Sequence, residues 1–531
     1  MDIRSTLKEK EIFLHLVLLF LVSFFSNQYY GYIGVNPFDS FPVYNAAFNI
    51  LNGKIPFKDY WIVHGPIIDF FQVIFFKLLG VNWFAYVTHS SIFNFLFSLI
   101  TYFTFLKFKL QKKYSLFYAL LLSLIFYPTV GTPFADQHAS MFSVIGFFSF
   151  ILAVKTKQLK YWILLPWILL IAFFCKQTPS SYVAISIFIF GIYYFIINFN
   201  RKYFFSLIFS SLLAILFTFG VFFLNEISIT NFYDQYILFA SSIGKTRLNA
   251  EFLFPLEFGR YFLKFKLIHI SQIILIIILF KNLIKNKNFI KDDDFIIIGS
   301  IIALAYIFII HQLMTLNVKF IYFLIPIMAG FSQVYFSKYY GFGKKIILLI
   351  IIGAFIFSSY NFIKYVDKRK FIVHKEFFDK KKIVTTNIID KKKSSFNWIT
   401  NLNQNPNDEI EDLKTTVSFI KNDQLNAKYE SIVITDYQFI FSKFDIKNVL
   451  VNKWYHPGVS YPVESGDLNY KVYTNFFIKK VRENNVKKVY FIKPSLFKDA
   501  DYFLKIIFSE CNIEKIQPLK LLTIYNLESC Y

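Results

Sequence analysis

Apolar stretches long enough to cross a membrane recur through the first 364 residues, and no other feature of this sequence constrains the fold as strongly. A transmembrane helix needs about 17–25 mostly apolar residues in a row. The fold class that we predict is therefore a polytopic α-helical membrane protein. We expect eleven spans, near residues 11–30, 83–106, 114–130, 139–154, 161–175, 179–198, 204–225, 266–284, 294–313, 318–337 and 345–363.

Charged residues are distributed unevenly along the chain. Among the first 364 residues 44 are charged, whereas 47 of the last 167 are. Soluble domains carry roughly 25% charged residues, so only the second part has the composition of a water-soluble domain. We predict a transmembrane domain at 1–364, a Lys- and Asn-rich linker at 365–405 and an exterior domain at 406–531.

The loops between the spans predict the orientation. If the N-terminus is cytoplasmic, alternate short loops all carry lysine or arginine on one side, as the positive-inside rule requires. The segments 31–82, 131–138, 226–265 and 365–531 then lie outside. The net charge of +23 follows from this topology, so a nucleic-acid partner is not indicated. The basic loop residues are Lys107, Lys109, Lys112, Lys113, Lys155, Lys157, Lys160, Arg201, Lys202, Lys281, Lys285, Lys287, Lys291, Lys338, Lys344 and Lys345.

The C-terminal part has the alternation of a small α/β domain. Its pattern predicts helices over 410–421 and 470–485 and strands over 431–437 and 486–492. Cys511 and Cys530 both fall in this part, each near the end of a candidate strand pair. They are compatible with a disulfide in an oxidising compartment and equally with two buried thiols.

Several motifs of catalysis and nucleotide binding are absent from the sequence, including GxGxxG, GxxxxGK[ST], CxxC, HExxH and GxSxG. A nucleotide site is therefore unsupported. What remains is a small set of carboxylates in the first two exterior loops, namely Asp39, Asp59, Asp69 and Asp136. Carboxylates at membrane depth are costly and tend to be functional.

The first exterior segment predicts a short helix over 41–52, capped by Ser40, with Pro42 in its first turn and Gly53 at its end. Asp39 precedes this helix, whose dipole favours a carboxylate over the neutral acid. Asp39 is then either a base or merely a helix cap. The apolar stripe along the helix is expected to lie on the membrane surface; it consists of Phe41, Tyr44, Phe48 and Leu51.

This segment resembles the first exterior loop of the GT-C membrane glycosyltransferases, in the bacterial branch of protein O-mannosyltransferases and the lipid A aminoarabinose transferase. The positions that match are Asp39, Tyr44, Ala46, Ala47, Gly53, Pro56, Phe57, Lys58, Asp59, His64, Gly65 and Pro66. Two positions depart from the family pattern. Ser40 stands where a second acidic residue is usual, and His64 stands where many relatives have lysine.

Later segments extend the resemblance over about the first 330 residues. Asp136 stands before a span, as a second acidic residue does in the family. Lys176 and Gln177 are similar to a Lys-Gln pair at an outer span end. Lys319, Tyr322 and Pro326 resemble an Arg-Tyr…Pro element with lysine in the arginine position.

The resemblance implies an inverting transfer of a sugar from a polyprenyl-phosphate donor to a glycan, lipid or protein acceptor. Asp39 is then the general base. Asp136 and Asp59 orient the acceptor or hold cationic groups. Cations stabilise the departing lipid phosphate, and the candidates are His64, Lys176, Arg247 and Lys319.

These residues also have structural interpretations, which stay open. Lys176 and Lys319 can extend to lipid headgroups, and Asp59 and Asp136 can act as caps. No cofactor is required by the sequence, although a divalent metal could be held by Asp39, Asp136 and His138.

The location implied is the bacterial cytoplasmic membrane, with the C-terminal domain periplasmic or extracytoplasmic. A polysaccharide polymerase or ligase of the cell envelope is the first alternative, and its cations would lie in the 226–265 loop. A non-catalytic transporter is the second. It would place charges deep within the spans, where this sequence has few, such as His89 and His311.

Overall fold

The structure is a computed structural model of the chain. It describes residues 3–34, 37–249, 259–315, 318–341, 343–368, 383–389, 396–399, 405–425, 427–463, 468–493, 503–504, 507–508 and 513–527. The chain divides into two compact units, which are described separately. Unit 1 comprises Met1–Gly31, Val87–Phe219 and Arg247–Lys370, and unit 2 comprises Tyr32–Tyr86, Gly220–Thr246 and Phe371–Tyr531.

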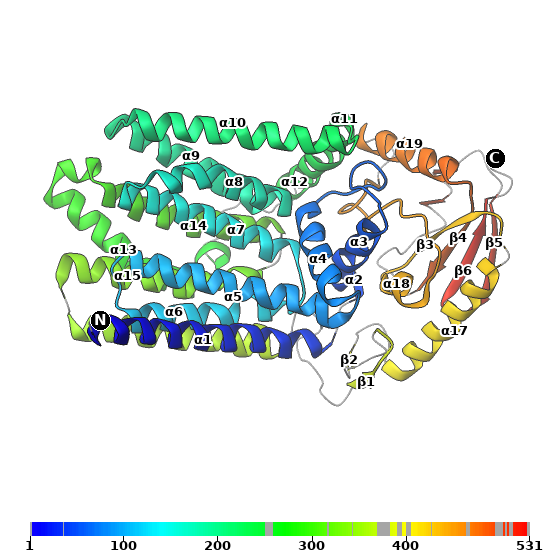
Figure 1. The fold of residues 1–531 in the computed structure, drawn as a ribbon, viewed down its shortest axis with the longest axis horizontal. Coiled ribbons are helices and arrows are strands. Elements are labelled where there is room, and N and C mark those ends of the chain that lie inside the picture. Colours follow the sequence, from blue (N-terminus) through cyan, green and yellow to red (C-terminus); the bar gives the residue numbers. More distant parts are fainter. Residues whose placement is uncertain are drawn as a thin grey trace. The chain divides into compact units, whose positions relative to one another are not determined.

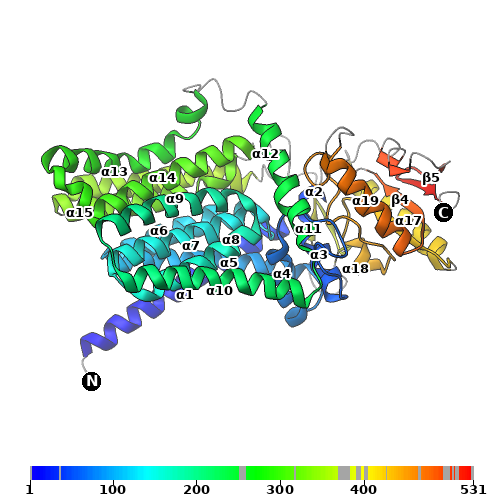
Figure 2. The ribbon, with the colours of Figure 1, turned by 90° about the horizontal axis from the view of Figure 1, so that it is seen from above.

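Unit 1 is a bundle of long helices that run side by side (Figures 1 and 2). Its helices are mostly apolar, because each has to contact either lipid or another helix along its whole length. They are α1 (Ile3–Tyr32), α5 (Trp83–Lys107), α6 (Lys112–Ile125), α7 (Ala135–Thr156), α8 (Leu159–Cys175), α9 (Gln177–Ile197), α10 (Arg201–Leu224), α13 (Lys266–Lys285), α14 (Asp293–Thr315), α15 (Leu324–Tyr340) and α16 (Lys344–Asn361).

Every one of the eleven predicted spans coincides with one of these helices. Within the described residues, eight helices are long and apolar enough to cross a membrane. The protein is therefore a multi-pass membrane protein. The other three, α6, α8 and α15, have 14, 17 and 17 residues. The prediction for α6 ran too far because Pro128 begins a 3₁₀ turn at Tyr127–Thr129, which ends the α-helical hydrogen bonding.

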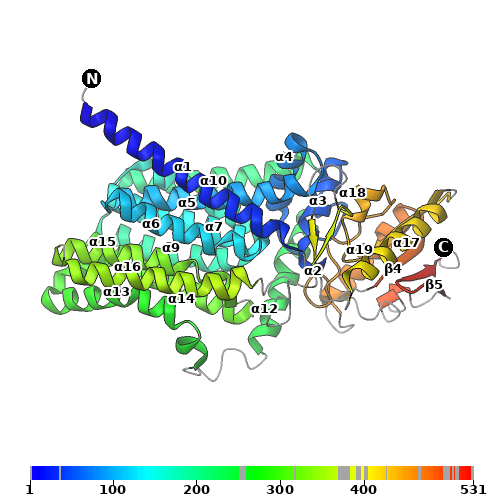
Figure 3. The same cartoon turned by 90° about the horizontal axis from the view of Figure 1, so that it is seen from below.

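Helix α7 is the best-buried long helix of unit 1, with α8, α9 and α14 packed around it. A helix that is apolar on all sides is expected in such a central position. α15 packs against α13, α16 and α6, and Figure 3 shows α13, α15 and α16 together. Gly330 of α15 leaves room for the ring of Phe105 on α5, since a Cβ there would lie 2.3 Å from Phe105 Cζ.

Short 3₁₀ and π segments connect the longer helices. In unit 1 they are Tyr127–Thr129, Gly259–Leu263, Lys287–Lys291, Val318–Ile321 and Phe362–Asp367.

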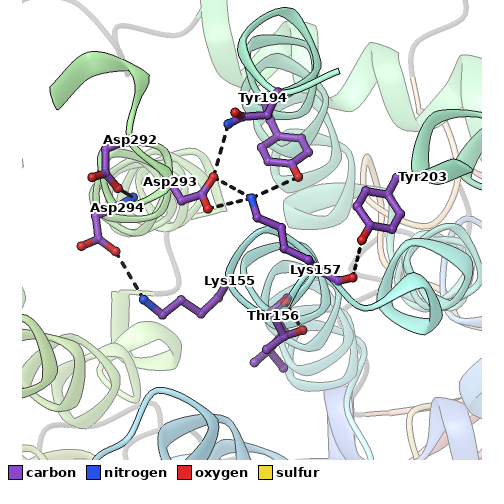
Figure 4. Close-up of polar contacts among 10 residues, drawn as sticks. Lys155, Thr156, Lys157, Tyr194, Tyr203, Asp292, Asp293 and Asp294 are labelled. Atoms are coloured by element: carbon purple, nitrogen blue, oxygen red, sulfur yellow. Dashed lines mark hydrogen bonds and ion pairs between the residues drawn. The ribbon is translucent and has the colours of Figure 1, made fainter. Parts of the chain in front are cut away.

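The loops predicted to share the cytoplasmic side meet at one end of unit 1. Lys157 after α7 donates to Asp293 at the start of α14, with 2.7 Å between Nζ and Oδ2. Lys155 lies 3.5 Å from Asp294, and Lys338 of α15 also pairs with Asp294. Figure 4 shows Lys155 and Lys157 reaching toward neighbouring aspartates. The meeting of these loops agrees with the predicted alternation of sides, whereas the side that faces the cytosol stays a prediction.

Unit 2 is formed from three segments that are far apart in the sequence, and most of each lies within a predicted exterior segment. Its elements are α2 (Pro37–Ser40), α3 (Pro42–Leu51), α4 (Pro66–Leu79), α11 (Ile229–Phe232), a π segment (Tyr233–Leu238), α12 (Phe239–Asn249), β1 (Val384–Thr386), β2 (Phe396–Trp398), α17 (Pro406–Leu425), β3 (Glu430–Ile434), α18 (Ile440–Phe444), α19 (Leu468–Glu483), β4 (Val486–Ile492), β5 (Glu514–Leu519) and β6 (Leu522–Asn526).

A four-stranded sheet of order β3-β4-β6-β5 lies in the C-terminal part of unit 2 (Figure 1). β3 and β4 are parallel, whereas β6 pairs antiparallel with both β4 and β5. Because side chains alternate along a strand, β4 contacts a different helix on each face of the sheet. Val489 and Phe491 share a core with Phe477 of α19, while Lys488 and Tyr490 donate to Asp423 of α17. The predicted α/β organisation is confirmed.

Backbone hydrogen bonds join the three segments of unit 2. The Trp61 N–H donates to the carbonyl oxygen of Val451 at 2.7 Å, and Lys453 N–H donates back to Trp61 O at 3.0 Å. Gln235 accepts from Ile62 N–H at 3.0 Å. The first exterior segment is thus part of the same core as the C-terminal sheet.

The predicted tail elements correspond to α17, β3, α19 and β4, and the β5–β6 hairpin corresponds to the strand pair indicated, without bounds, near Cys511 and Cys530. Within the stretch predicted as a linker, β1 and β2 pair antiparallel, and Trp398 is fully buried. Cys511 and Cys530 lie outside the described residues.

Candidate active site

A buried ionic cluster lies at the end of unit 1 where α7 begins. Lys176 Nζ donates to both carboxylate oxygens of Asp136, at 2.9 Å and 2.8 Å. His311 Nε2 lies 3.4 Å from Asp136 Oδ1. The Asp136 and His311 side chains are almost fully buried, whereas 17% of the Lys176 side chain is exposed. Lys176 is therefore the member of the cluster that a ligand can reach.

The local sequence explains how the three side chains come together. Asp136 is in the first turn of α7, where the helix dipole favours a carboxylate. Lys176 is extended between α8 and α9. His311 is near the C-terminal end of α14, which packs against α7 and α9. A charge removed from water needs a partner, and Asp136 provides one for the Lys176 ammonium.

Two glutamines adjacent in sequence to this cluster add unused hydrogen-bonding capacity. Gln137 follows Asp136 and Gln312 follows His311, and both are buried. Neither the amide nitrogen nor the amide oxygen of either side chain has a hydrogen-bond partner among the described residues. Buried polar groups are nearly always hydrogen-bonded. Unsatisfied buried amides are therefore expected where a polar ligand or ordered water binds.

His138, a candidate metal ligand, has both ring nitrogens in hydrogen bonds. Its Nε2 lies 3.0 Å from His89 Nε2, and its Nδ1 is hydrogen-bonded to the Tyr127 hydroxyl. A metal at His138 would have to displace one of them. No group of three or more His, Cys, Asp or Glu side chains in the described part of the chain could hold a metal ion.

Asp39 lies in α2 of unit 2, in a half-buried position. The helix predicted after it is confirmed as α3, but Ser40 is not its cap. Pro42 is the first helical residue, so Phe41 is the N-cap and makes no side-chain capping bond. Ser40 instead accepts from the Tyr86 hydroxyl through its carbonyl oxygen, at 2.7 Å.

The first half of the apolar stripe of α3 is buried and does not lie on a membrane surface, which corrects the prediction. Phe41 and Tyr44 are buried inside unit 2. Phe41 packs against Trp83 and Phe439, and Tyr44 packs edge-on against Phe76 and Tyr86. The stripe was assigned to lipid because the sequence does not show that the C-terminal part covers it.

Asp59 forms two hydrogen bonds with Ile55 in the same turn. Its Oδ2 accepts from Ile55 N–H at 2.7 Å, and its N–H donates to the Ile55 carbonyl oxygen at 2.9 Å. The neighbouring Lys58 forms an ion pair of 2.6 Å with Glu226. These contacts give Asp59 a structural role in shaping the loop.

The His64-Gly65-Pro66 turn leads into α4. Gly65 has φ of 85°, a conformation that favours glycine, and Pro66 begins the helix. His64 is half-buried, with its ring edge-on to Trp454. The carbonyl oxygen of His64 accepts from Lys453 Nζ at 3.3 Å.

The same turn positions a second buried ion pair, between Asp69 of α4 and Lys453. Lys453 Nζ lies 2.8 Å and 2.7 Å from the two carboxylate oxygens. Burial raises the pKa of Asp69 to about 7, although the Lys453 ammonium opposes this shift. Asp69 and Lys453 are 384 positions apart, so the pair ties the first exterior segment to the C-terminal part.

The remaining candidates are placed only by their backbone. Arg247 lies in α12 and Lys319 in the 3₁₀ segment Val318–Ile321. Their side chains are outside the described residues.

The structure brings Asp136 and Lys176 together, as the family resemblance allows. It also adds His311 and Lys453, to which the sequence gave no role. A histidine deep in an apolar span was the only signal for His311. For Lys453 the sequence offered none.

No protein-family model matches the chain, and no curated protein matches its sequence. Among solved structures, the fold is similar to the oligosaccharyltransferase of Archaeoglobus fulgidus tethered with an acceptor peptide. That similarity has a TM-score of 0.46 and 12% identity, over 97% of this chain and 74% of that one. The fold is also similar to the archaeal oligosaccharyltransferase AglB in complex with an inhibitory peptide and a dolichol-phosphate. That similarity has a TM-score of 0.46 and 10% identity, over 97% of this chain and 74% of that one.

ArnT from Cupriavidus metallidurans bound to undecaprenyl phosphate is similar at a TM-score of 0.46 and 9% identity, over 97% of this chain and 98% of that one. These proteins are GT-C glycosyltransferases, the family that the sequence resembles. The similarity concerns the course of the chain and assigns no role to any of its residues.

Proposed function

We propose that this protein is a membrane glycosyltransferase that takes a sugar from a polyprenyl-phosphate donor. The observation that supports this most is the buried Asp136–Lys176–His311 cluster in a bundle of spanning helices. Burying such a cluster destabilises a membrane protein unless its charges are well paired, because removing ions from water costs several kcal/mol for each ion. A functional reason for retaining it is therefore expected.

The cluster suits a departing phosphate. When the bond between the sugar and the lipid phosphate breaks, negative charge grows on the phosphate oxygens. Lys176 offers an ammonium that Asp136 already holds in place, so little reorganisation is needed as that charge develops. His311, on the other side of the carboxylate, supplies a second nitrogen. The unsatisfied amides of Gln137 and Gln312 are further groups that can bind a polar ligand.

In the proposed reaction an acceptor hydroxyl oxygen attacks the anomeric carbon while the phosphate leaves, which inverts that carbon. The hydroxyl proton passes to a carboxylate, for which we propose Asp39 on the strength of the family resemblance. We propose that Asp59 shapes the loop and does not take this proton, since its Oδ2 accepts from Ile55 N–H. The proposed location is the bacterial cytoplasmic membrane, with the C-terminal domain, residues 406–531, in the periplasm or extracytoplasmic space.

Purified protein in liposomes tests the proposal directly. We would supply a panel of polyprenyl-phosphate sugars with glycan, lipid and peptide acceptors and follow release of the polyprenyl phosphate by mass spectrometry. The proposal predicts acceptor-dependent release for at least one donor, and its loss in Asp39→Asn. Full release by a folded Asp39→Asn variant would remove Asp39 from the mechanism.

A further inference from the structure

A pocket of about 290 Å³ lies at the end of unit 1 away from the Asp136 cluster. Asp136 is in the first turn of α7 and Lys155 is in its last turn, which separates them by about 28 Å along the helix. The pocket lies between the α5–α6 connection and the last turns of α7 and α15. The residues that matter among those lining it are Lys109, Tyr114, Lys155, Gln333, Tyr335 and Lys338.

The charges around this pocket are unbalanced. Lys155 and Lys338 share the single carboxylate of Asp294, which is buried. Lys109 is exposed and has no partner among the described residues. Among the described residues, the pocket lining therefore contains three lysines and no acidic residue. The Lys338 side chain is 45% exposed, so an anion can reach the pocket from outside.

A buried hydroxyl in the pocket wall also lacks a partner. Tyr335 lines the pocket, and its phenol oxygen is buried without a hydrogen bond to any described residue. Its ring lies against Phe108. An unpaired buried O–H is unfavourable unless a ligand or water accepts from it. Gln333, beside it in the wall, already accepts from the Tyr118 hydroxyl.

We propose that this pocket binds the phosphate group of an anionic phospholipid. Phosphate oxygens are acceptors, which matches a set of lysine ammonium groups and a phenol that all donate. The pocket lies at the ends of membrane-spanning helices, where lipid headgroups are, and basic pockets between such helices bind headgroup phosphates. This lipid site is distinct from the Asp136 cluster and does not depend on sugar transfer.

The test uses the full-length protein in nanodiscs and compares retention of phosphatidylglycerol with that of phosphatidylcholine by native mass spectrometry. The test variants are Lys109→Gln/Lys338→Gln and Tyr335→Phe. The matched control is Lys202→Gln/Lys287→Gln, which removes two exposed lysines from loops predicted to lie on the same side. Inorganic phosphate is added in a separate arm, so that a soluble ligand can be distinguished from a lipid.

We expect wild type to prefer phosphatidylglycerol, and the preference to fall about fivefold for each pocket lysine removed. Tyr335→Phe, which keeps the ring, should lower it about threefold. The control should stay within about twofold of wild type. An unchanged preference in both test variants, or an equal loss in the control, would overturn the proposal. Displacement of the lipid by millimolar inorganic phosphate would overturn it too, since a soluble phosphate would then be the ligand.

Discussion

Lys176 Nζ lies within 2.9 Å of both carboxylate oxygens of Asp136, which is in the first turn of α7, whereas Lys176 is the extended residue between α8 and α9. The carboxylate is almost fully buried, while part of the lysine side chain is exposed. Asp136 therefore holds the Lys176 ammonium in position.

The first prediction concerns the stability of this pair. Lys176→Gln leaves Asp136 buried beside His311 alone, so we expect it to destabilise unit 1 by about 3–5 kcal/mol. Asp136→Asn/Lys176→Gln removes both charges and should recover most of that loss. Thermal unfolding in detergent would measure both variants. Equal destabilisation by the single and double variants would show that packing, and not charge, dominates there.

The second prediction concerns the pair that joins two distant segments of unit 2. Lys453→Met removes the partner of the buried Asp69 carboxylate, and we expect a loss of about 3–5 kcal/mol at pH 8. Asp69→Asn/Lys453→Met should be less destabilised than Lys453→Met alone. Limited proteolysis of the C-terminal part would report the change. Similar cleavage of wild type and Lys453→Met would contradict a supporting role for the pair.

A pH dependence follows from the same residue. Burial raises the pKa of Asp69 to about 7, above its unfolded value of about 4. Between these values the folded state retains a proton that the unfolded state has released. The contribution of Asp69 to stability is therefore full below about pH 4 and is lost as the pH rises to about 7, by at most about 4 kcal/mol. Subtracting the unfolding curve of Asp69→Asn from that of wild type, pH by pH, should isolate this fall. If the stability of wild type relative to Asp69→Asn instead increased between pH 4 and pH 7, the prediction would be wrong.

The fourth prediction separates the two carboxylates of the first exterior segment. Asp59→Ala removes the acceptor for Ile55 N–H and should cost about 1 kcal/mol in stability. Since it takes no part in proton transfer, the transfer rate should fall less than about tenfold. Asp39→Asn should show the opposite pattern, with stability retained and transfer abolished. Loss of transfer in a stable Asp59→Ala variant would return Asp59 to the mechanism.

The sequence predicts the elements of this protein better than it predicts their contacts. β4 spans Val486–Ile492, the predicted range, because its apolar run is bounded by polar residues. The positions of the helices of unit 1 follow equally from their apolar length. The β5–β6 hairpin was indicated only as a strand pair without bounds, since most of β5 is exposed and lacks an alternating apolar pattern.

The candidate site could be predicted only in part. Asp136 and Lys176 stand out in sequence because each is a charge next to an apolar span. Their pairing with His311 depends on the packing of α7, α9 and α14, which no local pattern encodes. Ser40 was misjudged as a cap because Pro42 moves the helix start by one residue. Lys453 acquires its role only when the chain folds back onto Asp69.

The central claim is that Lys176 meets the phosphate of the donor lipid, and the binding of undecaprenyl phosphate tests it most directly. The test variant is Asp136→Asn/Lys176→Gln, which removes both charges and keeps side chains of similar size. The control is Lys266→Gln, which removes an exposed lysine of α13. Both are compared with wild type. We predict that the double variant, folded by its melting curve, binds at least about tenfold more weakly than wild type. Lys266→Gln should bind as wild type does. Undiminished binding by the folded double variant would contradict the account.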